Sequence, residues 1–365
     1  MKKVLPISDS KIYATTHQAS LLAILFAYPE SYPWVYSNYI QQFTLRDIYH
    51  SNRVGTLDFF IDHYGDYEVL EHRICPMIRF ARIPREFLNE TDIIGTLIKY
   101  IDDGNYLYCT CDVFYISCWT NHFQKHHFPH MALVYGYDTQ EKVFYMGDNY
   151  FSGKYSLQKI PFSEMESSMR SYINGQILDQ SEGIELLKYR SPFIKPHYEG
   201  DWSKEVHSKE MLRLKIGKII NDIQGYLLYP EQSYQFQDSP LYAFGIAQHA
   251  VFREYIQNII DHNDRYVDVK FTSSMLDHKV LMKLRVDYIH SQHTLGKYEE
   301  LSENIQCLIE MVHAVQMLII KYNIAPSDRI LQKIYNNSFE IENKEKYFLE
   351  LLLHELQTEY KNVVL

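Results

Sequence analysis

Cysteine is scarce in this chain. The 365 residues contain five, which are Cys75, Cys109, Cys111, Cys118 and Cys307. Their odd number and wide spacing exclude the disulfide framework typical of small secreted domains. We therefore expect a protein of a reducing compartment, the cytoplasm.

Long apolar runs are also missing. The longest, such as residues 21–27, are far shorter than the roughly 20 residues that span a bilayer. The first ten residues are basic but become polar before an apolar segment can form, so we expect no signal peptide. On these grounds we expect neither a membrane anchor nor a membrane partner.

Basic charge is in the minority. The chain has 36 Lys and Arg against 46 Asp and Glu, a formal net charge of −10. Phosphate backbones are bound by clustered Lys and Arg, so we expect no nucleic-acid partner. A hydrophobic fraction of 46% and an aromatic fraction of 15% indicate a packed globular protein.

The pattern of elements changes near residue 195. Before it, residues 16–28 and 93–102 have the composition of helices, residues 106–116 that of a strand, and 130–138 with 142–148 that of a hairpin. A linker at 191–200 holds two Pro and one Gly. After it the sequence is mostly amphipathic helix, at about 208–225, 241–262, 272–290, 298–323 and 343–361. We expect an α+β domain at 1–195 and an all-helical domain at 196–365.

The hairpin carries a candidate catalytic pair. His130 begins its first strand, and Asp148 follows eighteen residues later at the end of the second. A carboxylate beside an imidazole fixes its tautomer and raises its basicity. With a nucleophile at the N-terminus of the early helix, this is the papain-like plan. The alternative is a structural histidine.

Several segments resemble the peptidase C39-like proteins, in the branch typified by the N-terminal domain of butirosin biosynthesis protein H. The hairpin, with His130-Met131-Ala132-Leu133-Val134 and Met146-Gly147-Asp148, resembles the His-to-Asp hairpin of that family. Ala19-Ser20-Leu21-Leu22 resembles its nucleophile helix, and Asp112-Val113-Phe114 its strand before the histidine loop. Tyr242–Ile246 and Leu276–Arg285 resemble the helical C-terminal region of relatives in nonribosomal peptide and other natural-product gene clusters.

The resemblance implies a papain-like fold and an amide-forming acyltransferase. Characterised relatives move an acyl group from a carrier-protein thioester to an amine, an aminoglycoside or a polyamine. The implied partners are an acyl- or peptidyl-carrier protein and a small amine acceptor. The phosphopantetheine arm of the carrier is part of the substrate, and no cofactor is expected. In the implied mechanism a Cys attacks the thioester, His130 is base and then acid, and Asp148 orients His130.

The sequence departs from that pattern at the nucleophile. The family helix aligns its nucleophile with Thr16, and no Cys lies within the first 74 residues. A threonine hydroxyl is a much weaker nucleophile than a thiol at neutral pH. The Gln that supplies the oxyanion hole in papain-like enzymes is also missing, since residues 8–12 read Ser-Asp-Ser-Lys-Ile.

Three functions therefore compete. In the first, the protein is an amide synthase in which Thr16 acts directly, or in which the amine attacks the thioester with His130 as base and without a covalent intermediate. In the second, it is an inactive relative that binds or scaffolds a biosynthetic assembly. The third, an ordinary peptidase, ranks last because both the Cys and the oxyanion Gln are missing.

Other polar clusters have two interpretations each. Cys118 with His122, His126, His127 and His130 has metal-like spacing, or forms a wet loop near the substrate. Cys109 and Cys111 share one face of a strand and either contact each other or a metal, or are core residues, as is typical of such a pair. Asp277, His278, Lys279 and Arg285 either receive a phosphopantetheine or carboxylate or brace the helices. Arg79, Arg82 and Arg85 form either a carrier-docking patch or a solvated strand face.

Overall fold

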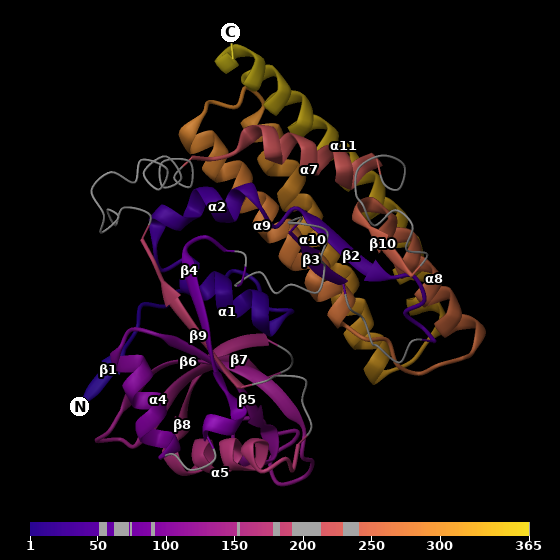
Figure 1. Ribbon diagram of the computed structural model, residues 1–365. Helices are drawn as coiled ribbons and strands as arrows, with labels where there is room; N and C mark the ends of the chain where they lie inside the picture. The colour runs from indigo at the N-terminus through magenta and orange to yellow at the C-terminus, as the bar shows by residue number, and fades with distance from the viewer. Residues whose placement is uncertain are drawn as a thin grey trace. The chain divides into compact units, whose positions relative to one another are not determined.

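The chain is divided into two compact units in its computed structural model (Figure 1). The first unit comprises Met1–Tyr32 and Glu68–Leu212, and the second comprises Pro33–Tyr67 and Arg213–Leu365. The structure describes residues 1–50, 57–61, 73, 75–88, 92–151, 154–177, 183–191, 213–228 and 241–364.

The first unit is built on a seven-stranded antiparallel sheet with strand order β4-β9-β5-β6-β7-β8, and β1 also pairs with β6. The strands are β1 (Lys2–Val4), β4 (Ile78–Pro84), β5 (Tyr106–Asp112), β6 (Pro129–Asp138), β7 (Val143–Phe151), β8 (Lys154–Pro161) and β9 (Gly183–Tyr189). The predicted hairpin is confirmed: β6 and β7 are adjacent and antiparallel, with Asp138 opposite Val143 at the turn.

Helices α1 (Thr16–Leu25), α4 (Ile93–Asp102) and α5 (Phe162–Ile173) pack on this sheet. Helix α1 contacts β6 and β7, whereas α5 contacts β5 and β8, and Figure 1 shows α1 and α5 on different sides of these strands. Every residue of α1 from Gln18 to Leu25 is buried, as expected for a helix that is apolar on most faces. The first unit also contains the short 3₁₀ turns η1 (Pro29–Ser31), η2 (Arg85–Leu88) and η3 (Val113–Tyr115).

The second unit is mostly helical, with one small antiparallel sheet. The sheet has the order β10-β2-β3, formed by β10 (Tyr242–Phe244), β2 (Gln41–Leu45) and β3 (Leu57–Phe60). Its helical elements are α2 (Tyr32–Ser37, whose first residue lies in the first unit), α7 (Ile216–Leu228), η4 (Gly245–Ala247), α8 (Gln248–Asp261), α9 (Lys270–Gln292), α10 (Tyr298–Ile324) and α11 (Asp328–Val364). Buried side chains from all five long helices form one apolar core, among them Ile223, Phe252, Met282, Leu308 and Leu352.

Helix α10 is, among the residues that the structure describes, the one helix long and apolar enough to cross a membrane. Its buried residues Leu308, Val312, Val315 and Ile319 follow helical spacing and belong to the core of the second unit. Three other apolar residues of the helix, Met317, Ile320 and Ile324, are exposed.

These elements confirm the coarse fold prediction, a chain of mixed helix and sheet with a helical C-terminal region. The expected boundary near residue 195 lies outside the described residues. The division of the chain differs from the prediction of domains at 1–195 and 196–365, because Pro33–Tyr67 belongs to the second unit. Two long-range interactions explain why. Strand β2 pairs with β10, and the buried Arg285 of α9 donates to the carbonyl oxygens of Tyr36 (2.8 Å) and Tyr39 (3.1 Å).

Single helices also differ in extent from their predictions. Residues 242–244 of the predicted helix 241–262 form strand β10, and α8 begins only at Gln248. Helix α11 begins at Asp328, well before the predicted start at 343, because a continuous buried stripe with Leu331, Ile334 and Ile341 extends it toward the N-terminus.

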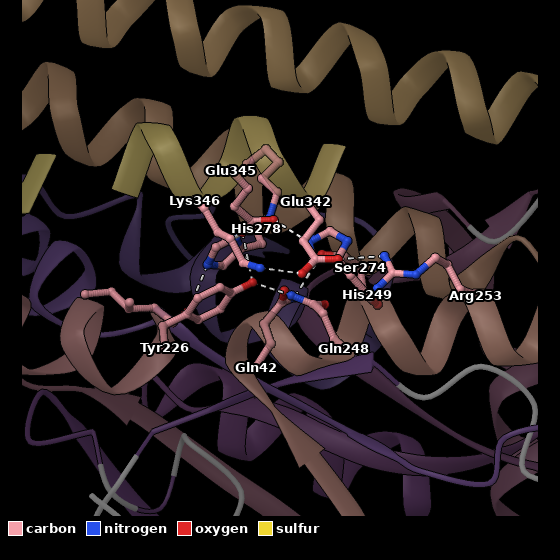
Figure 2. A network of polar contacts seen from close by, with 12 residues as sticks. Gln42, Tyr226, Gln248, His249, Arg253, Ser274, His278, Glu342, Glu345 and Lys346 are labelled. Carbon is pink, nitrogen blue, oxygen red and sulfur yellow. Dashed lines mark hydrogen bonds and ion pairs between the residues drawn. The ribbon is translucent and has the colours of Figure 1, made fainter. Parts of the chain in front are cut away.

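One carboxylate joins four helices of the second unit (Figure 2). Glu345 of α11 is buried and pairs with Lys279 of α9. His249 of α8 lies with its Nε2 atom 2.7 Å from Glu345 Oε2, and the Tyr226 hydroxyl of α7 donates to Glu345 Oε1 at 2.9 Å. Burial opposes ionisation of this carboxyl, but Lys279 and His249 outweigh it and hold the pKa of Glu345 below its usual value.

His278 completes this cluster as a neutral imidazole. Its Nε2 donates to the carbonyl oxygen of Ile40 at 2.8 Å, and its Nδ1 lies 3.0 Å from the Lys279 ammonium. Burial and the adjacent Lys279 charge hold the pKa of His278 well below its usual value. A neutral Nδ1 can therefore accept a hydrogen bond from Lys279, which leaves Lys279 and Glu345 as the buried ion pair.

We expect Lys279→Met to destabilise the full chain by about 3–5 kcal/mol, because it leaves the Glu345 carboxylate buried without its cation. The matched control is Lys283→Met on the same helix. Lys283 pairs with Asp287 at 3.7 Å, and both side chains are about one third exposed, so its loss costs about 0.5 kcal/mol or less. Urea unfolding followed by the helical circular dichroism signal gives both values. Equal midpoints for the two variants would contradict the stabilising role of the buried pair.

Candidate active site

The structure brings Thr16, His130 and Asp148 together in the first unit. Thr16 is the first residue of α1, His130 lies near the start of β6, and Asp148 lies in the adjacent strand β7. Asp148 is fully buried, whereas the His130 side chain is 33% exposed. A buried carboxylate beside an accessible imidazole is the geometry that the hairpin spacing predicts.

Asp148 contacts both Thr16 and His130. Its Oδ1 atom accepts hydrogen bonds from the Thr16 hydroxyl at 3.0 Å and from the Asn149 backbone N–H at 2.6 Å. Its Oδ2 atom lies 3.1 Å from Nδ1 of His130. The order of contacts is therefore threonine, aspartate, histidine.

The tautomer of His130 follows from the atoms around its Nδ1. This nitrogen hydrogen-bonds to the carbonyl oxygen of Met131 at 3.1 Å, and Asp148 Oδ2 lies at the same distance without the alignment of a hydrogen bond. Both neighbours are acceptors, so Nδ1 carries a proton. In the neutral ring, Nε2 is then the basic nitrogen.

Aromatic rings border His130. The Trp119 ring centroid lies 5.6 Å from that of His130 and 5.3 Å from that of Tyr150. Trp119 and Tyr150 are both buried. Their packing limits the positions open to the His130 ring on this side.

Thr16 differs from the role that the resemblance implies. A nucleophile activated by His130 would donate its proton to the imidazole, but the Thr16 hydroxyl donates to Asp148. A carboxylate is a much weaker base than an imidazole, so this contact does not generate an alkoxide. The geometry favours Thr16 as a polar partner of Asp148 over Thr16 as a nucleophile.

Asn149 is a residue of this site that sequence reasoning missed. Its Nδ2 donates to the carbonyl oxygens of Tyr13 (3.1 Å) and Ala14 (3.2 Å), the residues just before α1. These bonds hold the start of α1 against β7 and so place Thr16 beside Asp148. Adjacency to Asp148 was the available signal, but the partners of Asn149 are backbone atoms 135 and 136 residues away.

Cysteine offers no replacement nucleophile near this site. Burial raises the pKa of Cys118 to about 12, with further contributions from Glu164 and Asp148, and it raises the pKa of Cys75 to about 12. Burial also raises the pKa values of Cys109 and Cys111. Cys75, Cys109 and Cys111 are buried and behave as packing residues, whereas Cys118 is half-buried, and burial disfavours the thiolate at all four.

The histidines with metal-like spacing lie in the loop at residues 113–128, between β5 and β6, and at the start of β6. Among the residues that the structure describes, no group of three or more His, Cys, Asp or Glu could hold a metal ion. His127 instead pairs with the buried Asp112, with its Nδ1 2.7 Å from Oδ2, and its ring stacks on Phe114 at 4.1 Å. His127 is thus engaged by Asp112, which is not one of the residues with metal-like spacing.

The remaining candidates have partners within their own unit. His278, Lys279 and Arg285 are buried and bonded to Ile40, Glu345 and backbone carbonyl oxygens, and Asp277 is buried as well, so a bracing role fits better than a receiving site. In the arginine patch, Arg82 pairs with the buried Glu185 at 3.3 Å, and Arg85 donates to the carbonyl oxygen of Ile173 at 3.1 Å. Arg79 is exposed. The patch thus offers fewer charges for docking than the sequence indicates.

Comparisons with known proteins leave the chain without an assigned family. No protein-family model matches it, and no curated protein matches it.

We expect iodoacetamide to alkylate Cys307 and spare the other four cysteines of the native full chain at neutral pH. Cys307 is exposed, whereas burial keeps Cys75, Cys109, Cys111 and Cys118 protonated. Peptide mass spectrometry measures the label at each position, and the urea-unfolded chain is the positive control. Fast labelling of Cys118 in the native protein would identify it as an activated thiol and contradict this account.

Proposed function

We propose that the first unit is a papain-like domain of the C39-like type that forms amides by acyl transfer from a carrier-protein thioester to an amine. The proposal is supported by the position of His130 and Asp148 on adjacent strands beside the N-terminus of α1. It is also supported by the segments that resemble the butirosin biosynthesis protein H branch of that family. The expected partners are an acyl- or peptidyl-carrier protein, which presents the thioester on its phosphopantetheine arm, and a small amine.

The single observation that carries the proposal is the pair of acceptors around His130 Nδ1. Asp148 Oδ2 and the Met131 carbonyl oxygen both lie 3.1 Å from it, which assigns the proton to Nδ1 and the basic lone pair to Nε2. A positioned imidazole contributes about 10²–10⁴-fold to reactions that require proton transfer. His130 can supply this contribution without a cysteine.

The proposed reaction is a direct aminolysis. The amine nitrogen attacks the thioester carbonyl carbon and forms the new C–N bond, while His130 Nε2 takes the proton that the nitrogen loses. The C–S bond then breaks, and the protonated imidazole returns the proton to the departing thiolate. The products are the amide and the free pantetheine thiol, and the protein is regenerated without an acyl-enzyme intermediate.

Asp148 serves this reaction electrostatically. Its carboxylate faces the imidazole that becomes positively charged during the proton transfer and therefore stabilises it. The N-terminus of α1 provides a second contribution, since the helix dipole favours negative charge at this end, such as that of a tetrahedral oxyanion.

A second function is favoured by the contact of Thr16. Because its hydroxyl donates to Asp148, the position of the family nucleophile is occupied by a group without nucleophilic activation. This is the pattern of an inactive relative that binds a carrier protein or its product. The same experiments separate the two functions.

We expect His130→Ala to lower the rate of amide formation about 10²–10⁴-fold, because the base is lost. Thr16→Val should leave the rate within a factor of a few, because it keeps the shape and removes only the hydroxyl. The assay incubates the full chain with a panel of acyl-pantetheine thioesters and a polyamine or aminoglycoside, and mass spectrometry quantifies the amide. Intact protein mass should show no acyl adduct during turnover.

The control is His126→Ala, which removes an exposed histidine of the loop between β5 and β6 and should leave the rate unchanged. An acyl adduct on Thr16, together with loss of activity in Thr16→Val, would show that the reaction proceeds by covalent catalysis and would contradict direct aminolysis. A wild-type chain that forms no amide from any thioester, yet retains a carrier protein in a pulldown, would contradict catalysis and support the binding function.

A further inference from the structure

The loop that precedes His130 is closed by a backbone hydrogen bond from Val113 N–H to the Phe128 carbonyl oxygen (3.1 Å) and by the side chain of Asp112. The loop spans residues 113–128 between the end of β5 and the start of β6, and we call it the histidine loop. Asp112, the last residue of β5, pairs with Pro129 in the antiparallel register, and Cys111 pairs with His130. The loop therefore leaves and re-enters the sheet next to the candidate active site.

Asp112 binds both ends of this loop. Its Oδ1 atom accepts hydrogen bonds from the backbone N–H of Phe114 at 3.1 Å and of Phe128 at 3.3 Å. Its Oδ2 atom lies 2.7 Å from Nδ1 of His127 and accepts a bond from the Ser171 hydroxyl of α5 at 2.6 Å. The Asp112 side chain is fully buried, so these contacts replace all of its hydration.

The histidine loop carries the aromatic ring that borders His130. Trp119 is part of its middle turns, where His122 N and Phe123 N donate to the Trp119 carbonyl oxygen at 2.8 and 2.9 Å. The Trp119 ring packs against both His130 and Tyr150. His130 itself follows the loop by two residues, so a shift at the loop ends moves both the imidazole and the ring beside it.

We propose that Asp112 is a positioning residue that acts on His130 through the histidine loop. It fixes the loop at its start, through Phe114, and at its end, through Phe128 and His127. Ser171 in turn fixes the Asp112 carboxylate to α5. The inference rests on the proposed role of His130 in catalysis, but its first test observes the position of His130 directly and needs no substrate.

The test uses Asp112→Asn in the full chain. Asparagine keeps one carbonyl oxygen for Phe114 N and Phe128 N but presents an N–H donor to His127 Nδ1, so it changes the loop end nearest His130. The readouts are the ¹⁹F resonance of Trp119 in protein labelled with 5-fluorotryptophan and the Cε1–H resonance of His130. Trp119→Phe and His130→Gln assign them. We expect both resonances to shift or broaden in Asp112→Asn.

Asp138→Asn is the matched control. Asp138 lies at the opposite end of β6 and also accepts two backbone N–H groups, from Gln140 at 2.9 Å and Glu141 at 3.2 Å. Because the Asp138 carboxylate stabilises a turn at the other end of β6, we expect Asp138→Asn to leave the Trp119 and His130 resonances unchanged. Ser171→Ala is the second test variant, because it removes one tether of Asp112 and keeps the carboxylate.

Unchanged Trp119 and His130 resonances in a folded Asp112→Asn protein overturn the proposal. If circular dichroism shows that Asp112→Asn does not fold, the Trp119 and His130 resonances are measured in Ser171→Ala instead. Unchanged resonances in that variant would overturn the proposal. Where amide formation is measurable, the kcat of Ser171→Ala should fall about 10-fold to 10²-fold with KM within twofold, as expected for a displaced catalytic group. Altered resonances with no detectable activity in the wild type would uphold the positioning role and reject the proposed function.

Discussion

The candidate active site depends on the buried carboxylate of Asp148. A charged group without exposure to water is stable only with polar partners, and Asp148 finds them in Thr16, in the Asn149 backbone and in the His130 imidazole. This requirement joins the start of α1 to strands β6 and β7. The same carboxylate lies beside Nδ1 of His130 and accepts a hydrogen bond from the Thr16 hydroxyl, so one buried group contacts both side chains.

The second unit also contains a buried carboxylate that joins several elements. Glu345 is also a buried carboxylate, and its partners Lys279, His249 and Tyr226 come from three other helices. In this cluster none of the charged groups is exposed, whereas His130 beside Asp148 is one third exposed. Both carboxylates are buried, so the two clusters differ in the exposure of the basic side chain beside the carboxylate.

The sequence alone was sufficient to predict elements and contacts formed by residues that are close together in the chain. The helix at Ile93–Asp102 and the hairpin that brings His130 to Asp148 follow from local periodicity and turn signals, and the structure has them. The sequence alone was insufficient to predict contacts between segments that are far apart in the chain. Asp112 with Ser171 and Lys279 with Glu345 lie 59 and 66 residues apart, and no local pattern encodes either pair. The same limit explains why the predicted domains differ from the two units, because β10, which pairs with β2, and Arg285, which bonds to Tyr36, lie beyond residue 240.

The tautomer of His130 is the most direct test of this account. Long-range ¹H–¹⁵N correlation spectra of the ¹⁵N-labelled full chain, assigned with His130→Gln, report which ring nitrogen carries the proton. The account predicts that the neutral ring carries its proton on Nδ1 and that Nε2 is unprotonated. A proton on Nε2, with Nδ1 as the basic nitrogen, would contradict the assignment of His130 Nε2 as the base.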